Sequence, residues 1–137
     1  MLSKILLRVA AVLMFIHAVL HTTGFASWKT DPNRQEVVKA MVGPKLPFMG
    51  ANRNMAEFYD GFGYASTIAL LLISVTLWMV SASDNSLAKK IILTLAVTLL
   101  FWGVDEIIFF FPFAACISWL SCLCTFIAFF SLKKQSI

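Results

Sequence analysis

Long apolar stretches with few or no charges constrain this chain more than any other feature. A helix needs about 20 apolar residues to cross the hydrocarbon core of a bilayer, and the 137-residue chain has enough such stretches for four crossings. Hydrophobic residues make up 60% of the sequence and charged residues only 13%. Ordinary soluble domains are roughly 45–50% apolar. We therefore expect lipid, rather than water, to solvate most of the protein surface.

Charges and one proline divide the chain into four expected transmembrane helices. Pro112 separates the last two, because proline removes a backbone donor and clashes with the preceding turn. The pattern predicts an all-α fold, an integral membrane four-helix bundle with antiparallel helices that forms a single domain over residues 1–137. The four spans are expected at about residues 5–27, 56–82, 87–111 and 113–132.

The first connection is the only long one, and we expect a short interfacial helix within it. Asp31-Pro32 resembles an N-cap followed by proline at the first helical position. Gly43-Pro44 and Pro47 are expected to end this helix. Its apolar stripe would consist of Val37, Val38 and Met41.

Two further patterns concern the ends of the first two spans. Asn54 and Glu57 resemble a capping box that opens the second span, with asparagine in place of serine or threonine. Trp28, at the end of the first span, is typical of a residue that anchors a helix at the membrane interface. Both patterns place the first connection at a membrane surface.

The basic residues favour cytoplasmic termini. They lie in pairs beside apolar runs rather than in one patch, so the net charge of +4 does not indicate a nucleic-acid partner. An even number of crossings places both termini on one side. Six of the 11 basic residues fall on that side and lie beside the spans: Lys4, Arg8, Lys89, Lys90, Lys133 and Lys134. A cleaved signal peptide is the competing interpretation of the first span, because Gly24-Phe25-Ala26 has small residues at cleavage-type positions.

Ionisable residues inside the expected spans carry the strongest functional signal. Such residues are costly in a membrane and mark ion paths, binding sites or buried pairs. At about 1.5 Å per residue, the histidines of the first span and the acids of the second and third spans come to a similar depth near the outer leaflet. The candidate ligand-binding residues are His17, His21, Glu57, Asp60, Tyr64, Trp102, Asp105 and Glu106.

The pattern favours a particular centre for this polar cluster. We expect His21, Asp60 and Asp105 at its centre, with the other candidates around them. Asp105 and Glu106 are rotated by about 100° from each other on a helix, so both carboxylates need not face the same site.

Several functions fit such a cluster. The favoured interpretation is that it binds the head group of a lipid-soluble ligand, or a partner membrane protein, while the bilayer surrounds the helices. One alternative is a membrane enzyme in which a histidine and a carboxylate act as base and acid. Sterol isomerases of the emopamil-binding type are superficially similar in using such chemistry, but their motif is not matched residue by residue. His17 and His21, four residues apart, are also weak candidates for metal ligands. A purely structural cluster, in a protein that serves as an accessory subunit, is a further alternative. No cofactor is indicated.

Two motifs carry a resemblance to a known class of protein. The stretches His21-Thr22-Thr23-Gly24-Phe25 and Glu57-Phe58-Tyr59-Asp60-Gly61-Phe62-Gly63 flank the long first loop. In this arrangement the chain resembles small uncharacterised four-helix bacterial membrane proteins that are distantly similar to DoxX-like proteins. The resemblance implies a multi-pass protein of the bacterial inner membrane, and it adds little about mechanism.

Overall fold

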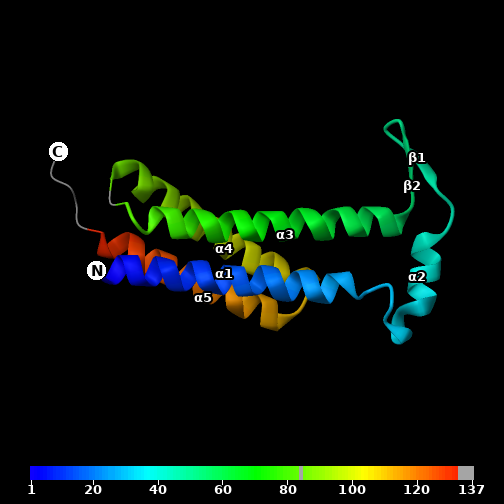
Figure 1. Ribbon diagram of the computed structural model, residues 1–137, viewed down its shortest axis with the longest axis horizontal. Coiled ribbons are helices and arrows are strands. Elements are labelled where there is room, and N and C mark those ends of the chain that lie inside the picture. The colour runs from blue at the N-terminus through cyan, green and yellow to red at the C-terminus, as the bar shows by residue number, and fades with distance from the viewer. Residues whose placement is uncertain (84, 133–137) are drawn as a thin grey trace. The chain divides into compact units, whose positions relative to one another are not determined.

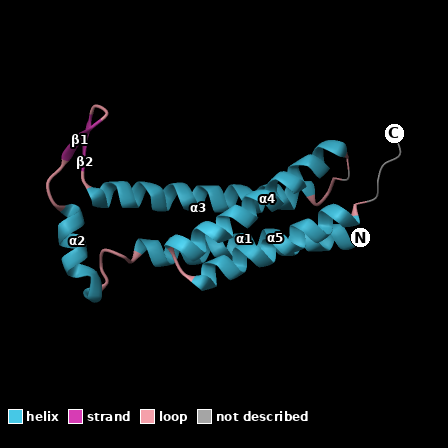
Figure 2. Ribbon diagram, turned by 180° about the vertical axis from the view of Figure 1, so that it is seen from behind, coloured by secondary structure: helices cyan, strands magenta, loops and turns pink. Residues whose placement is uncertain are grey.

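The computed structural model describes residues 1–83 and 85–132 and is built mainly from helices. It has four long helices, a short connecting helix and a small β-hairpin, and Figures 1 and 2 show how these elements follow one another. All four long helices are long and apolar enough to cross a membrane. They are α1 (Leu2–Ala26), α3 (Met55–Val80), α4 (Ser86–Phe109) and α5 (Pro112–Ser131). The predicted all-α fold with four candidate spans is therefore confirmed.

Pro112 separates α4 from α5, but it does so as the first residue of a helix. Helix α4 ends at Phe109, and Phe111 is the extended N-cap residue of α5. Proline suits this position because the first helical N–H has no partner within the helix. The third and fourth spans were expected at about residues 87–111 and 113–132, and the structure has the break between them at Phe110 and Phe111. Lys133 and Lys134, which were expected beside the last span, lie outside the described residues.

The connection between α1 and α3 contains the predicted short helix. The side chain of Asp31 caps a 3-10 turn, η1 (Pro32–Arg34), by accepting a hydrogen bond from the Asn33 amide, and α2 (Gln35–Val42) follows. Gly43 ends α2, as predicted.

A β-hairpin follows α2, although the sequence analysis expected only a break there. Strands β1 (Leu46–Phe48) and β2 (Ala51–Arg53) pair antiparallel, with Leu46 opposite Arg53. Met49 and Gly50 have φ angles of 46° and 87°, and two positive φ angles are typical of a type I′ turn. Pro47 is compatible with a strand because this two-stranded sheet consists only of edges.

The chain divides into two compact units, and α1 and α3 each contribute to both of them. Unit 1 consists of Met1–His17 with Leu70–Ile137, and unit 2 consists of Ala18–Ala69. Unit 1 therefore holds the first part of α1, the last part of α3, and the antiparallel hairpin formed by α4 and α5 (Figure 1).

Small side chains allow the helices of unit 1 to pack closely. Ser74 on α3 donates a hydrogen bond to the carbonyl of Ala11 on α1 over 2.8 Å. The Cys122 thiol on α5 contacts the Ala96 carbonyl on α4 at 3.2 Å. The Trp119 indole occupies the space that Gly103 leaves free. Close backbone approach through small and hydroxyl residues is characteristic of membrane helix interfaces.

Unit 2 is organised around a small aromatic core. Phe25 and Trp28, at the end of α1, are buried together with Ala56 at the start of α3. Val38 and Met41 of α2 pack against this core, whereas Val37, predicted to share their stripe, is exposed. Helix α2 thus covers the ends of α1 and α3 within unit 2.

Two glycines of α3 provide a matched test of this packing. A methyl group at Gly63 would overlap with the buried ring of Phe25, whereas a methyl group at Gly61 would meet open space. We predict that Gly63→Ala destabilises the protein by about 1–3 kcal/mol, as overpacking does. Gly61→Ala should be neutral, or stabilising by up to about 1 kcal/mol through higher helix propensity. Thermal unfolding in detergent checks this, and equal midpoints for the two variants would contradict the described packing.

Candidate functional site

A histidine and a glutamate form a buried pair inside unit 1. His17 Nε2 on α1 lies 3.0 Å from Glu106 Oε1 on α4, and each residue is only 4% exposed. The Trp102 indole donates a hydrogen bond to the same carboxylate oxygen over 3.0 Å. Ser118 Oγ on α5 lies 3.4 Å from His17 Nδ1. We call these four residues the His17–Glu106 centre.

Helical spacing explains how the centre is assembled. Trp102 and Glu106 are four residues apart on α4, so their side chains lie on one helix face. Helices α1 and α5 bring the other two side chains from distant parts of the chain. When the Ser118 hydroxyl donates to Nδ1, the ring proton of a neutral His17 is on Nε2 and is donated to Glu106. Ser118 thus orients the imidazole toward the carboxylate.

The second carboxylate oxygen of Glu106 is the unusual feature of this centre. Oε2 is buried and has no hydrogen-bond partner among the residues that the structure describes. Leaving a buried acceptor unsatisfied costs about 1–3 kcal/mol, and more when the group is charged. Such an orphaned atom in a folded protein calls for a partner, and a bound molecule with a donor group is one such partner.

The candidate residues of unit 2 have local partners. Asp60 accepts a hydrogen bond from the Trp28 indole over 3.0 Å and forms an ion pair with Lys29. His21 Nε2 lies 3.2 Å from the carbonyl oxygen of Gly63, and Tyr64 packs edge-on against Phe25. Each contact joins the end of α1 to the start of α3, so these residues have a structural explanation.

Glu57 is also explained by local structure. Its amide donates to Asn54 Oδ1 and its Oε2 accepts from the Asn54 amide, both over 2.9 Å. This reciprocal pair is the predicted capping box at the N-terminus of α3. Glu57 Oε1 also lies 3.1 Å from Lys45 Nζ.

The structure brings together only some of the residues that were expected to meet. His17, Trp102 and Glu106 form one centre in unit 1, whereas Asp105, the neighbour of Glu106, is exposed on α4. This agrees with the rotation of about 100° between adjacent helical residues. The expected grouping of Asp105 with His21 and Asp60 spans both units, and it stays a prediction.

The metal-site interpretation gains no support from the side chains. Among residues 1–83 and 85–132, no group of three or more His, Cys, Asp or Glu side chains is placed to hold a metal ion. Both ring nitrogens of His17 are within 3.5 Å of protein atoms, those of Ser118 and Glu106. A metal ion there would have to displace one of these contacts.

Three contributors were missed by the sequence analysis. Neither Ser118 nor Lys29 was among the candidate residues. Trp28 was expected to anchor the interface, but it is 5% exposed and bonded to Asp60. Their shared partner, Asp60, lies 32 residues after Trp28 and 31 residues after Lys29. No local sequence pattern indicates a contact over that separation.

No family model, curated protein or solved structure matches this chain. The geometry and chemistry of the described side chains are therefore the basis for assigning a function. The resemblance to DoxX-like proteins stays a prediction.

A double-mutant cycle tests the buried pair. We predict that His17→Ala and Glu106→Ala are coupled by about 0.5–3 kcal/mol, because each single change leaves the other polar group buried without its partner. The free energy of unfolding in detergent is measured for wild type, the two single variants and the double variant. Asp105→Ala, the exposed neighbour, is the matched control and should show coupling near zero with His17→Ala. Equal coupling for both acids would contradict the observed pairing.

Proposed function

We propose that this protein is a small multi-pass membrane protein that binds a lipid-soluble ligand at the His17–Glu106 centre. The observation that carries the proposal is Glu106 Oε2, a buried carboxylate oxygen that has no partner among the described residues. Ionisable groups within membrane helices mark functional sites by default, because their burial is costly.

The chemistry of the centre defines the class of ligand. When Glu106 is ionised, its carboxylate only accepts hydrogen bonds, so the ligand must then present a donor, such as a hydroxyl group. Charge-assisted bonds of this kind are about twice as strong as neutral ones. The helices around the centre are apolar, so the rest of the ligand must be apolar as well. A lipid-soluble alcohol or phenol has both properties.

Acid–base catalysis is the second candidate function. His17 Nε2 and Glu106 Oε1 are 3.0 Å apart. A proton can pass directly between two groups at this hydrogen-bond distance. In that case the bound molecule is a substrate, and the donor group on Oε2 is its reacting group. A partner membrane protein that inserts a donor side chain would satisfy the same oxygen.

We further propose that the protein lies in the bacterial inner membrane with cytoplasmic termini. Four apolar helices return the chain to the side on which it began. Arg8 lies over the Trp78 ring at 4.9 Å from its centroid, and Lys89 lies over the Phe129 ring at 5.4 Å. Cationic and aromatic residues together are typical of a membrane–water interface.

Native mass spectrometry tests ligand binding. The full-length protein is extracted from its membrane in mild detergent, and the retained small molecule is identified by mass. We expect wild type to retain a lipid-soluble molecule with a donor group. Glu106→Gln should lower its occupancy about tenfold or more, because a charged hydrogen-bond acceptor is worth about 1.5–3 kcal/mol.

Asp105→Asn is the matched control, because it removes an adjacent but exposed acid. This variant should retain the molecule as wild type does. Equal occupancy in Glu106→Gln and wild type, or an empty and fully folded wild-type protein, would contradict ligand binding at Glu106. An enzyme would be recognised by a different mass in Glu106→Gln, because substrate would accumulate in place of product.

Cysteine labelling tests the proposed orientation. Met49, at the tip of the hairpin, is 94% exposed, and Leu2 lies at the start of α1. The native thiols Cys116, Cys122 and Cys124 are first replaced by serine. We expect a membrane-impermeant maleimide to label Met49→Cys in cells with a permeabilised outer membrane, and Leu2→Cys only after the inner membrane is opened. The reverse pattern would place the termini outside.

A further inference from the structure

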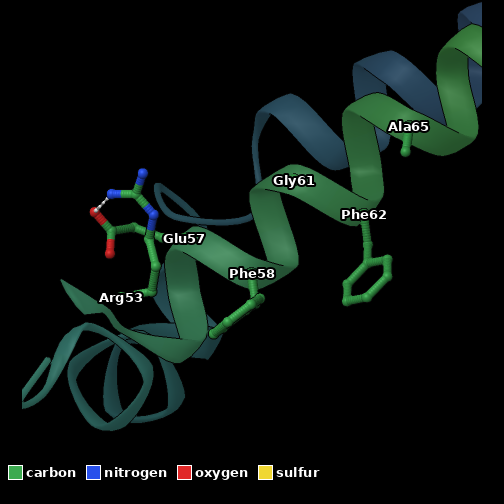
Figure 3. A pocket seen from close by; sticks show the side chains of 6 residues that line it. All are labelled: Arg53, Glu57, Phe58, Gly61, Phe62 and Ala65. Atoms are coloured by element: carbon green, nitrogen blue, oxygen red, sulfur yellow. Dashed lines mark ion pairs between the residues drawn. The ribbon is translucent and has the colours of Figure 1, made fainter. Parts of the chain in front are cut away.

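An open groove runs along the start of α3 in unit 2, and none of its lining residues belongs to the His17–Glu106 centre. Figure 3 shows its lining, in which one polar end is followed by an apolar floor. The groove has a volume of about 260 Å³. Its lining residues are Arg53, Glu57, Phe58, Gly61, Phe62 and Ala65.

The polar end of the groove has a net positive charge once Lys45 is counted, which does not line the groove but contacts its lining residue Glu57. Lys45 Nζ and Arg53 Nη1 lie 3.1 and 3.8 Å from the same oxygen, Glu57 Oε1. Two cations therefore share one carboxylate. The other oxygen of Glu57 accepts a hydrogen bond from the Asn54 amide, so both carboxylate oxygens are engaged by protein groups.

Arg53 keeps donors for another acceptor. Its distance of 3.8 Å from Glu57 exceeds the 2.7–3.2 Å of a typical N–H···O hydrogen bond. The guanidinium has five N–H donors in a planar fork that matches a phosphate group. An anionic oxygen placed beside Arg53 would thus gain bonds that Glu57 does not provide.

The floor of the groove is apolar and follows one face of α3. Phe58, Gly61, Phe62 and Ala65 recur at the spacing of a single helix face. Phe62 is 71% exposed, and a methyl group added at Gly61 would meet nothing within 4 Å. The missing side chain at Gly61 leaves open space next to the exposed ring of Phe62, and we infer that a hydrocarbon chain lies there against the helix backbone.

We infer that this groove binds an anionic phospholipid, with its phosphate on Arg53 and Lys45 and one acyl chain lying over Gly61. The combination of a cationic end and an apolar floor on a candidate membrane helix matches the two parts of such a lipid. A zwitterionic lipid is a poorer match, because its own ammonium group competes for the phosphate and is repelled by the two cations. This site is separate from the proposed function at Glu106, and neither depends on the other.

Native mass spectrometry with defined lipids tests this inference. The delipidated full-length protein is incubated with dioleoyl-phosphatidylglycerol or dioleoyl-phosphatidylcholine, and the fraction that retains one lipid is measured. We expect wild type to retain phosphatidylglycerol about fivefold better than phosphatidylcholine. One basic residue near a membrane surface adds about 1 kcal/mol to the binding of an anionic lipid, which corresponds to this ratio. Equal retention of both lipids by wild type would overturn the inference directly.

Three variants locate the lipid. Arg53→Gln should remove the preference for phosphatidylglycerol, and Gly61→Leu should lower its retention by filling the floor while leaving the charges in place. Arg34→Gln is the control, because Arg34 belongs to the same connection but pairs with Asp31 at 3.1 Å. A loss as large in Arg34→Gln as in Arg53→Gln would show general charge attraction and would overturn the site.

The fold of each variant is verified by thermal unfolding, and Gly61→Ala serves in place of Gly61→Leu if the larger side chain lowers the midpoint. Retention of phosphatidylglycerol that is unchanged in Arg53→Gln would also overturn the inference. In that case the groove would be a surface for another protein rather than for a lipid.

Discussion

A buried carboxylate on an apolar helix must find its partners inside the protein, and in unit 1 this requirement falls on Glu106. Its Oε1 has two partners, from α1 and from its own helix, whereas Oε2 has none among the described residues. Removing an ion from water is costly, and an ion pair offsets the cost only when the remaining polar atoms are also bonded. A hydrophobic pair of similar size would pack these helices as well. We therefore propose that the half-satisfied centre binds a molecule that donates to Oε2.

The polar residues of unit 2 differ because each has a structural role. Asp60 holds Trp28 and Lys29 at the end of α1, and Glu57 caps α3. Their carboxylates are engaged near the start of α3 by residues of the first connection. The same capping residue brings Lys45 and Arg53 together. The cap at the start of α3 thus creates the cationic end of an open groove. The two cations at this end favour an anionic lipid.

The sequence predicted the fold well and the site only in part, for physical reasons. Hydropathy and length determine the four long helices, and the Asn54–Glu57 cap depends on local spacing alone. The hairpin was missed because Met49-Gly50 lacks the Asn-Gly signature of its turn. Depth along the helices brought His17 and Glu106 into one candidate set. Their pairing, and the contribution of Ser118, depend on how three helices rotate against one another, which helical periodicity alone does not determine.

The most direct test of the central claim is an experimental structure of the full-length protein crystallised from a lipidic phase. The account predicts non-protein density about 3 Å from Glu106 Oε2, extending from a single donor atom into an apolar body. The His17 and Trp102 contacts to Oε1 should be preserved. A protein side chain that donates to Oε2, with no bound molecule beside it, would contradict the account and make the pair a packing device.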